Sequence, residues 1–319
     1  TLPNHQRGLT VPTLSQATNM FDQRTMHGAY FALAAYGFWG VAPIYFKLLG
    51  HVSPIEILCH RVIWSVFLLL GILAYTGQLA ALRVTRRQLG LCLVTAILLS
   101  INWLIFIDAI ISNNIVEASL GYFINPLVNV FLGMLFLREY LRPLQWIAIS
   151  IAALGIGFQV FTLGALPWVS LALAFSFGFY GLIRKSLQLH PVGGLAIETL
   201  MMLPPALACL AWFYSQGAVS FAHIDRSTDV LLMLGGVVTS FPLLCFAAAV
   251  GRLSLTAAGM FQYLAPSLTL VIAIVIFNEA FGIERLITFA CIWVALLIFS
   301  IEALHHHRRI SLRLKTNLL

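Results

Sequence analysis

The sequence predicts an all-α integral membrane protein with ten transmembrane helices, and three observations lead to this fold class. Of the 319 residues, 61% are hydrophobic and only 9% are charged, whereas a soluble domain carries roughly 25% charged residues. Ten apolar segments are each long enough to cross a bilayer, which takes about 20 helical residues. Basic residues also gather on alternate connections between these segments. Lipid must therefore solvate most of the apolar surface.

The predicted spans follow one another with short connections, and the fifth and sixth are separated only by residues 162–166. The spans are 28–48, 54–75, 89–110, 115–137, 143–161, 167–186, 192–215, 229–250, 255–277 and 283–303. Residues 1–27 are polar and lack the apolar region of a signal peptide, so we expect a disordered cytoplasmic segment there. Residues 304–319 are predicted to form a basic cytoplasmic tail that meets anionic lipid headgroups.

The positions of the 18 Lys and Arg residues predict the orientation of the chain. With the N-terminus inside, 14 of them fall on cytoplasmic segments, whereas Lys47, Arg226 and Arg285 are external and Arg61 lies within a span. Cytoplasmic loops of membrane proteins carry an excess of basic residues, which predicts that both termini are cytoplasmic. The net charge of +7 therefore reports topology, and we expect no nucleic-acid partner.

The two halves of the sequence resemble each other. Residues 116–139 align with 256–279 at an offset of 140, which matches a mid-span proline and a terminal glutamate in both segments. Residues 37–40 (GFWG) likewise match 178–181 (GFYG) at an offset of 141. Ordered matches across several helices indicate an internal duplication.

Each half contains five predicted spans, so the second half would insert upside down relative to the first. We therefore expect two five-helix repeats, 28–161 and 167–303, of the inverted type in which two halves can rock about a site at the bilayer midplane. Pro126 and Pro266 lie at matching points of the two repeats. Each removes a helical hydrogen bond, which predicts symmetry-related kinks with a role in gating.

Few ionisable residues lie inside the predicted spans. A charged side chain at the centre of a span costs about 2.5–3.5 kcal/mol on insertion scales, so it usually faces a cavity or a partner. Glu56, His60, Arg61 and Trp64 lie in the outer third of the second span, and helical spacing places three of them on one face with Arg61 beside them. His60 could couple solute movement to protons. The alternative is an ion-pair cluster that fixes this helix against its neighbours.

Other polar and aromatic side chains in the spans are candidates for a binding cavity. Buried amides act either between helices or as cavity donors; we favour cavity lining for Asn102 and Asn125, and contact between helices for Asn129. In the second half, Glu198 is expected to form an ion pair with the basic residues that precede it. The remaining candidates for solute binding are Trp39, Trp103, Tyr122, Tyr180, Gln262 and Tyr263.

The charged sector belongs to the first half alone, because Met202 and Leu203 stand opposite His60 and Arg61 at an offset of 142. Any central site should therefore be asymmetric. A net-positive cavity would favour anionic or zwitterionic solutes over purely cationic ones.

Several segments resemble the drug/metabolite transporter superfamily, specifically its EamA-type members, and look most like the RarD subfamily. The similarity covers about residues 28–303. The segments that carry it are 36–47 (YGFWGVAPIYFK), 56–65 (EILCHRVIWS), 117–127 (EASLGYFINPL), 174–181 (AFSFGFYG) and 261–263 (FQY). This resemblance implies a multi-pass permease of the bacterial inner membrane that exports small metabolites.

The sequence lacks HExxH, GxSxG, a P-loop glycine pattern and paired Asp motifs, so we expect no enzyme activity, no cofactor and no metal site. The expected function is transport by alternating access, in which His60 could couple transport to protons. The expected partners are a small-molecule solute and membrane lipids. A non-transporting structural or regulatory membrane protein is the alternative. The sequence does not determine the oligomeric state, for which a monomer is the working expectation.

Overall fold

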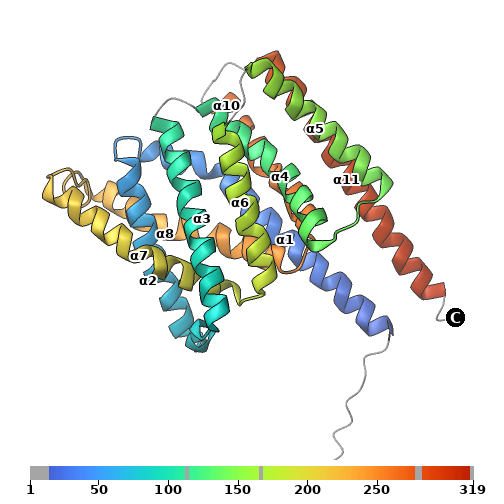
Figure 1. Ribbon diagram of the computed structural model, residues 1–319, viewed down its shortest axis with the longest axis horizontal. Coiled ribbons are helices and arrows are strands. Elements are labelled where there is room, and N and C mark those ends of the chain that lie inside the picture. Colours follow the sequence, from blue (N-terminus) through green and yellow to red (C-terminus); the bar gives the residue numbers. More distant parts are fainter. Residues whose placement is uncertain (1–13, 112–114, 165–167, 277–281, 317–319) are drawn as a thin grey trace, which may run out of the picture.

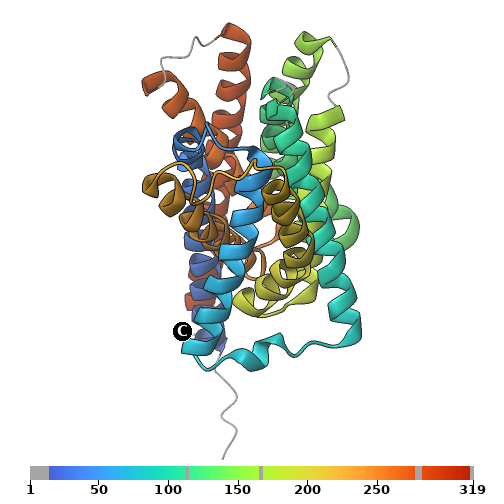
Figure 2. The ribbon, with the colours of Figure 1, turned by 90° about the vertical axis from the view of Figure 1, so that its left-hand side faces the viewer.

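A computed structural model describes residues 14–111, 115–164, 168–276 and 282–316. Every regular element in these ranges is a helix (Figures 1 and 2). The helices are α1 (Leu14–Leu48), α2 (Pro54–Tyr75), the 3-10 helix η1 (Leu79–Leu82), α3 (Arg86–Ile111), α4 (Ile115–Leu137), α5 (Pro143–Leu163), α6 (Trp168–Leu187), α7 (Pro191–Ser215), α8 (Arg226–Val250), α9 (Leu255–Gln262), α10 (Leu264–Val275) and α11 (Ile283–Thr316).

Six of these helices are long and apolar enough to cross a membrane, which agrees with the all-helical, multi-pass architecture predicted from the sequence. They contain the segments Gln23–Leu48, Pro54–Tyr75, Arg86–Phe106, Pro143–Thr162, Pro191–Ser215 and Arg226–Val250. Shorter apolar helices occur at Gly121–Leu137 and Leu286–Glu302. The count of ten spans and the orientation with both termini inside stay predictions.

The structure describes part of the N-terminal segment. Helix α1 begins at Leu14, so residues 14–27 are helical in this structure, whereas residues 1–13 lie outside the described ranges; disorder of the segment stays a prediction. The extension has a tertiary partner, because Arg24 Nη2 donates to the carbonyl of Gly251 at 3.0 Å. A polar composition did not predict a helix that is stabilised by contact with a distant loop.

Helices of the first half of the chain pack mainly against helices of the second half. Helix α1 packs on α8, and α6 packs on α3; α4 packs on α6, while α1 packs on α9 and α10. Helix α2 contacts α7 and α8, and α5 lies beside α11 at one side of the molecule (Figure 1). Each of these contacts has a counterpart when the first and second halves are interchanged. An inverted repeat would produce this pattern, and the repeat itself stays a prediction.

The two mid-span prolines affect their helices differently. Helix α4 continues through Pro126, whereas the matching helix of the second half is divided at Tyr263 into α9 and α10. Pro266 has no N–H to donate to the carbonyl of Gln262, four residues before it, which explains why the division falls there. A gating role for either proline stays a prediction.

The connection between α8 and α9 is held by side chains from two other parts of the chain. The two carboxylate oxygens of Glu139 accept from the amides of Leu255 and Thr256 at 2.6 and 2.9 Å. Lys185 Nζ donates to the carbonyls of Val250, at 3.1 Å, and Leu253. We call this end of the bundle the inner end, because the predicted orientation places it in the cytoplasm.

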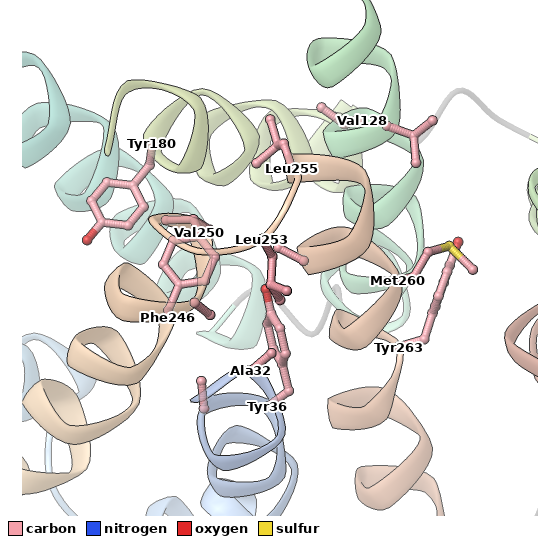
Figure 3. Packing of buried hydrophobic residues seen from close by; sticks show 14 of the residues in the cluster. Ala32, Tyr36, Val128, Tyr180, Phe246, Val250, Leu253, Leu255, Met260 and Tyr263 are labelled. Carbon is pink, nitrogen blue, oxygen red and sulfur yellow. The ribbon is translucent and has the colours of Figure 1, made fainter. Parts of the chain in front are cut away.

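The buried side chains behind this connection form a continuous apolar layer. Figure 3 shows Val250, Leu253 and Leu255 beside Ala32 and Tyr36 of α1. All five residues are buried. The inner end is therefore closed in this structure by backbone hydrogen bonds and by apolar packing.

Glu139→Ala should lower the free energy of unfolding by about 1.5–3 kcal/mol, because hydrogen bonds to charged groups contribute on that scale and α9 loses the acceptor at its first amides. Urea or thermal unfolding in detergent measures the change. Glu139→Gln is the matched control: its amide keeps one acceptor oxygen, so it should lose less. Equal stability of wild type and Glu139→Ala would contradict the role of this contact.

Candidate solute-binding site

Arg61 lies where four helices meet. Its Nε donates to Thr239 Oγ1 of α8 at 2.7 Å. The guanidinium carbon lies 5.3 Å from the ring centre of Phe46 on α1 and 4.9 Å from that of Trp103 on α3. A side chain from α2 that touches α1, α3 and α8 lies between helices of the bundle. It is nevertheless partly exposed.

Arg61 differs from the arginines that form ion pairs, because it has no carboxylate partner among the described residues. Arg142 Nη1 lies 2.6 Å from Glu302 Oε1, and Arg184 Nη1 lies 3.5 Å from Glu198 Oε1. Among the residues whose side chains are described, no acidic group lies within ion-pair distance of Arg61. Aromatic faces stabilise a cation by about 0.5–2 kcal/mol, but they leave its charge in place.

Tyr122 of α4 borders the same junction. Its side chain is 43% exposed, and it lies within electrostatic range of Arg61. Its ring packs edge-to-face on Phe106 at 5.9 Å between centroids. The junction thus combines one guanidinium, one accessible phenol and the aromatic walls of Phe46 and Trp103.

Glu56, His60 and Trp64 form a second group one turn away on α2, as their spacing predicted. Glu56 is fully buried, and its Oε1 accepts from the amides of Ser220 and Phe221, in the α7–α8 connection, at 2.8 and 3.0 Å. His60 Nε2 lies 4.0 Å from Glu56 Oε1, and its Nδ1 accepts from Trp64 Nε1 at 3.3 Å. The sequence offered no sign that Glu56 would hold a distant loop.

An aromatic cluster of Tyr36, Trp39, Phe177, Tyr180 and Phe246 joins α1, α6 and α8. Trp39 meets Phe177 at 5.8 Å and Phe246 at 6.1 Å between ring centroids, and Tyr180 stacks on Phe246 at 5.9 Å. Tyr36 and Tyr180 are fully buried, whereas Trp39 remains partly exposed. Figure 3 shows Tyr36, Tyr180 and Phe246 near the residues of the closed connection. Along α1, Tyr36 and Trp39 of this cluster lie between Ala32, which packs at the inner end, and Phe46, which contacts Arg61.

Glu198 forms the ion pair that was expected for it. The carboxylate is fully buried and accepts from Thr95 Oγ1 of α3 at 2.6 Å and from Tyr180 of α6 at 3.5 Å, besides its contact with Arg184. A Cβ atom at Gly194 would lie 2.1 Å from Arg184 Nη1, so glycine leaves the space that the guanidinium fills. The hydroxyl of Tyr180 therefore bonds to this ion pair, and its ring packs in the aromatic cluster.

The side-chain amides in the spans bond both within and across helices. Asn102 Nδ2 donates to the Leu173 carbonyl at 3.0 Å and to Ser176 Oγ at 2.9 Å. Asn129 Nδ2 donates to Asn125 Oδ1 at 3.2 Å and to Gln262 Oε1 at 3.0 Å. Asn125, Gln262 and the fully buried Tyr263 lie in the packed interior between α4, α9 and α10. This geometry favours the structural alternative for these residues, and a part in solute binding stays a prediction for them.

The structure thus separates the predicted set into groups. Arg61, Trp103 and Tyr122 share one junction, Glu56, His60 and Trp64 lie beside it, and Trp39 borders its inner side. Sequence reasoning missed Phe46 and Thr239, which carry no charge and resemble ordinary residues of an apolar helix.

A helical multi-pass fold with a partly exposed cation among aromatic rings is compatible with a membrane transporter, and similarity to known proteins gives this class. The model of the EamA-like transporter family matches residues 26–161. The chain is 49% identical to an uncharacterized transporter of Vibrio cholerae over 89% of this chain and 95% of that one. It is 44% identical to the protein RarD of Escherichia coli, over 92% and 100% of the two chains.

The chain belongs to the EamA-like transporter family and, within it, to the RarD-like proteins, which confirms the resemblance found in the sequence. A relative in Pseudomonas aeruginosa, 32% identical over 85% of this chain and 92% of its own, is called chloramphenicol-sensitive protein RarD. A protein of known crystal structure superposes with a TM-score of 0.71 at 16% identity, over 88% of this chain and 99% of that one. That last similarity concerns the fold alone.

Glu198→Ala should destabilise the protein by roughly 3–5 kcal/mol, since removing one partner leaves the Arg184 charge buried without compensation. The measurement is the unfolding transition of the purified protein in detergent. A double variant, Arg184→Leu with Glu198→Leu, is the control and should be more stable than Glu198→Ala because it buries no charge. A double variant less stable than the single one would show that the unpaired charge is not the cause.

Proposed function

We propose that this protein carries a small polar or amphipathic metabolite across the bacterial inner membrane by alternating access, and that it acts as an exporter. The observation that carries the proposal is the exchange of packing partners between the two halves. Helix α1 rests on α8, α9 and α10, and α6 rests on α3 and α4. Two halves that interlock in this way can rock against each other and expose a site between them to either side.

The positions of the closed and exposed parts of the bundle support this mechanism. The inner end is closed by Glu139, Lys185 and the apolar layer around Leu253, while Tyr122 and Arg61, further toward the other end, keep exposed surface. An exporter needs a conformation of this kind to release its solute outside. The bacterial relatives and the apolar helices support the inner membrane as the location.

Proton coupling through His60 forms part of the proposal, and the geometry gives it a mechanism. An indole N–H can only donate, so His60 Nδ1 must be unprotonated to accept from Trp64 Nε1. A proton added at Nδ1 would break this hydrogen bond and release the Trp64 side chain. The added charge would lie 4.0 Å from the carboxylate of Glu56, which is placed to compensate it.

Alternating access predicts that a cysteine at position 122 is reachable from both sides of the membrane. In Tyr122→Cys, with the five native cysteines replaced, a membrane-impermeant maleimide should label spheroplasts from outside and inverted vesicles from inside. Glu139→Gln in the same background weakens the inner closure and should increase labelling from inside. Labelling from one side only, in both backgrounds, would contradict alternating access.

Export predicts a change in the growth medium when the protein is overproduced. At least one small metabolite should rise outside the cells and fall within them relative to cells that carry an empty vector, as measured by mass spectrometry of both fractions. The opposite changes would indicate import. No change in any metabolite would favour the structural or regulatory alternative.

A further inference from the structure

We propose that the solute of this transporter is a small amphipathic carboxylate, bound with its carboxylate on Arg61 and its apolar end, such as a ring, against Trp39. The inference rests on the proposed transport function and names the class of solute. Three observations lead to it: the orientation of the guanidinium, its aromatic surroundings, and the position of Trp39 on α1.

The guanidinium of Arg61 is fixed at one nitrogen and open at the other two. Its Nε–H is bound to Thr239 Oγ1 at 2.7 Å, and Thr239 is 1% exposed, so this hydrogen bond is sealed inside the bundle. The four N–H groups of Nη1 and Nη2 have no acceptor among the described residues. Arginine presents these donors in a planar fork that matches the two oxygens of a carboxylate.

The surroundings of the fork favour an anion. The guanidinium meets the rings of Phe46 and Trp103 and the hydroxyl of Thr239, none of which carries a negative charge. Tyr45 is also within electrostatic range, but its hydroxyl donates to a backbone carbonyl of α8. Tyr122, which is 43% exposed and within electrostatic range, would add an O–H donor for the same anion. A cationic solute would meet an uncompensated positive charge here, in a medium where repulsion is stronger than in water.

The apolar end follows from the geometry of α1. Trp39 and Phe46 are seven residues apart, so they lie on nearly the same face of the helix and about 10 Å apart along its axis. Phe46 marks the level of Arg61, and Trp39 belongs to the aromatic cluster while keeping part of its surface exposed. A solute with a carboxylate and one ring joined by a short chain spans about this length.

The test compares four probes on the purified full-length protein by isothermal titration calorimetry. They are 3-phenylpropionate, its amide, 3-phenylpropylamine and acetate. We expect 3-phenylpropionate to bind at least tenfold more tightly than the amide and the amine, which lack the negative charge, and than acetate, which lacks the ring. A tenfold ratio corresponds to about 1.4 kcal/mol.

Variants assign the two ends of the solute. Arg61→Gln should abolish the preference for 3-phenylpropionate over its amide, and Arg61→Lys, which keeps the charge without the fork, should reduce it in part. Arg226→Gln, at an exposed position of α8, is the matched control and should bind as the wild type does. Trp39→Leu should weaken 3-phenylpropionate and leave acetate unchanged. The unfolding temperature without probe reports whether each variant is folded.

An acidic residue of the chain could fill the fork instead. Asp108 and Glu117 are the candidates, since their side chains lie outside the described residues. If the fork is open to solute, Asp108→Asn and Glu117→Gln should bind 3-phenylpropionate with unchanged affinity. An affinity at least tenfold higher in either variant would mean that an internal carboxylate occupies Arg61, and this would overturn the inference.

Other results would also overturn it. These are the absence of 3-phenylpropionate binding to the wild type at millimolar concentration, equal or tighter binding of the amine, and unchanged carboxylate binding in Arg61→Gln and Arg61→Lys. Flux of labelled probe in proteoliposomes separates this inference from the proposed function. Arg61-dependent binding without flux would support the carboxylate site but contradict transport of this solute class, whereas flux of a neutral or cationic solute that is insensitive to Arg61→Gln would support transport and contradict the inference.

Discussion

The structure depends on one constraint, the high cost of placing a charge or an unpaired polar group inside an apolar bundle. Several buried charges among the described residues have a specific partner. Glu198 pairs with Arg184, and the carboxylates of Glu56 and Glu139 accept from backbone amides of distant connections. These contacts also fix where the connections lie. The interactions that compensate the buried charges therefore also determine a large part of the tertiary structure.

Arg61 stands out against this pattern. Its guanidinium is held by Thr239 and by two rings, and no described carboxylate neutralises it. A protein that pairs its other buried charges gains nothing in stability from this arrangement, because the aromatic contacts only partly offset the lost hydration. The proposed carboxylate solute would supply the missing negative charge. In the proposed alternating-access cycle, the aromatic cluster around Trp39 would lie between this solute and the closed inner end.

Hydropathy and spacing predicted most of the fold, for a definable reason. Lipid forces the backbone of each span to satisfy its hydrogen bonds within the span, so a long apolar segment is almost certain to be a helix whatever its neighbours are. Where this constraint does not act, the sequence is less informative. The polar composition of residues 14–27 predicted no helix, yet in this structure they belong to α1, with Arg24 bound to the carbonyl of Gly251.

The sequence by itself determined the helical multi-pass class, the family, and the short set of polar residues within the spans, Arg61 among them. Only the tertiary structure decided what each of these residues meets. Thr239 lies 178 residues from Arg61, and the loop held by Glu56 lies 164 residues away. The hydropathy of a span specifies that it is buried in lipid but carries almost no information about which other span packs on which face, so the partners of a buried side chain emerge only when the helices assemble.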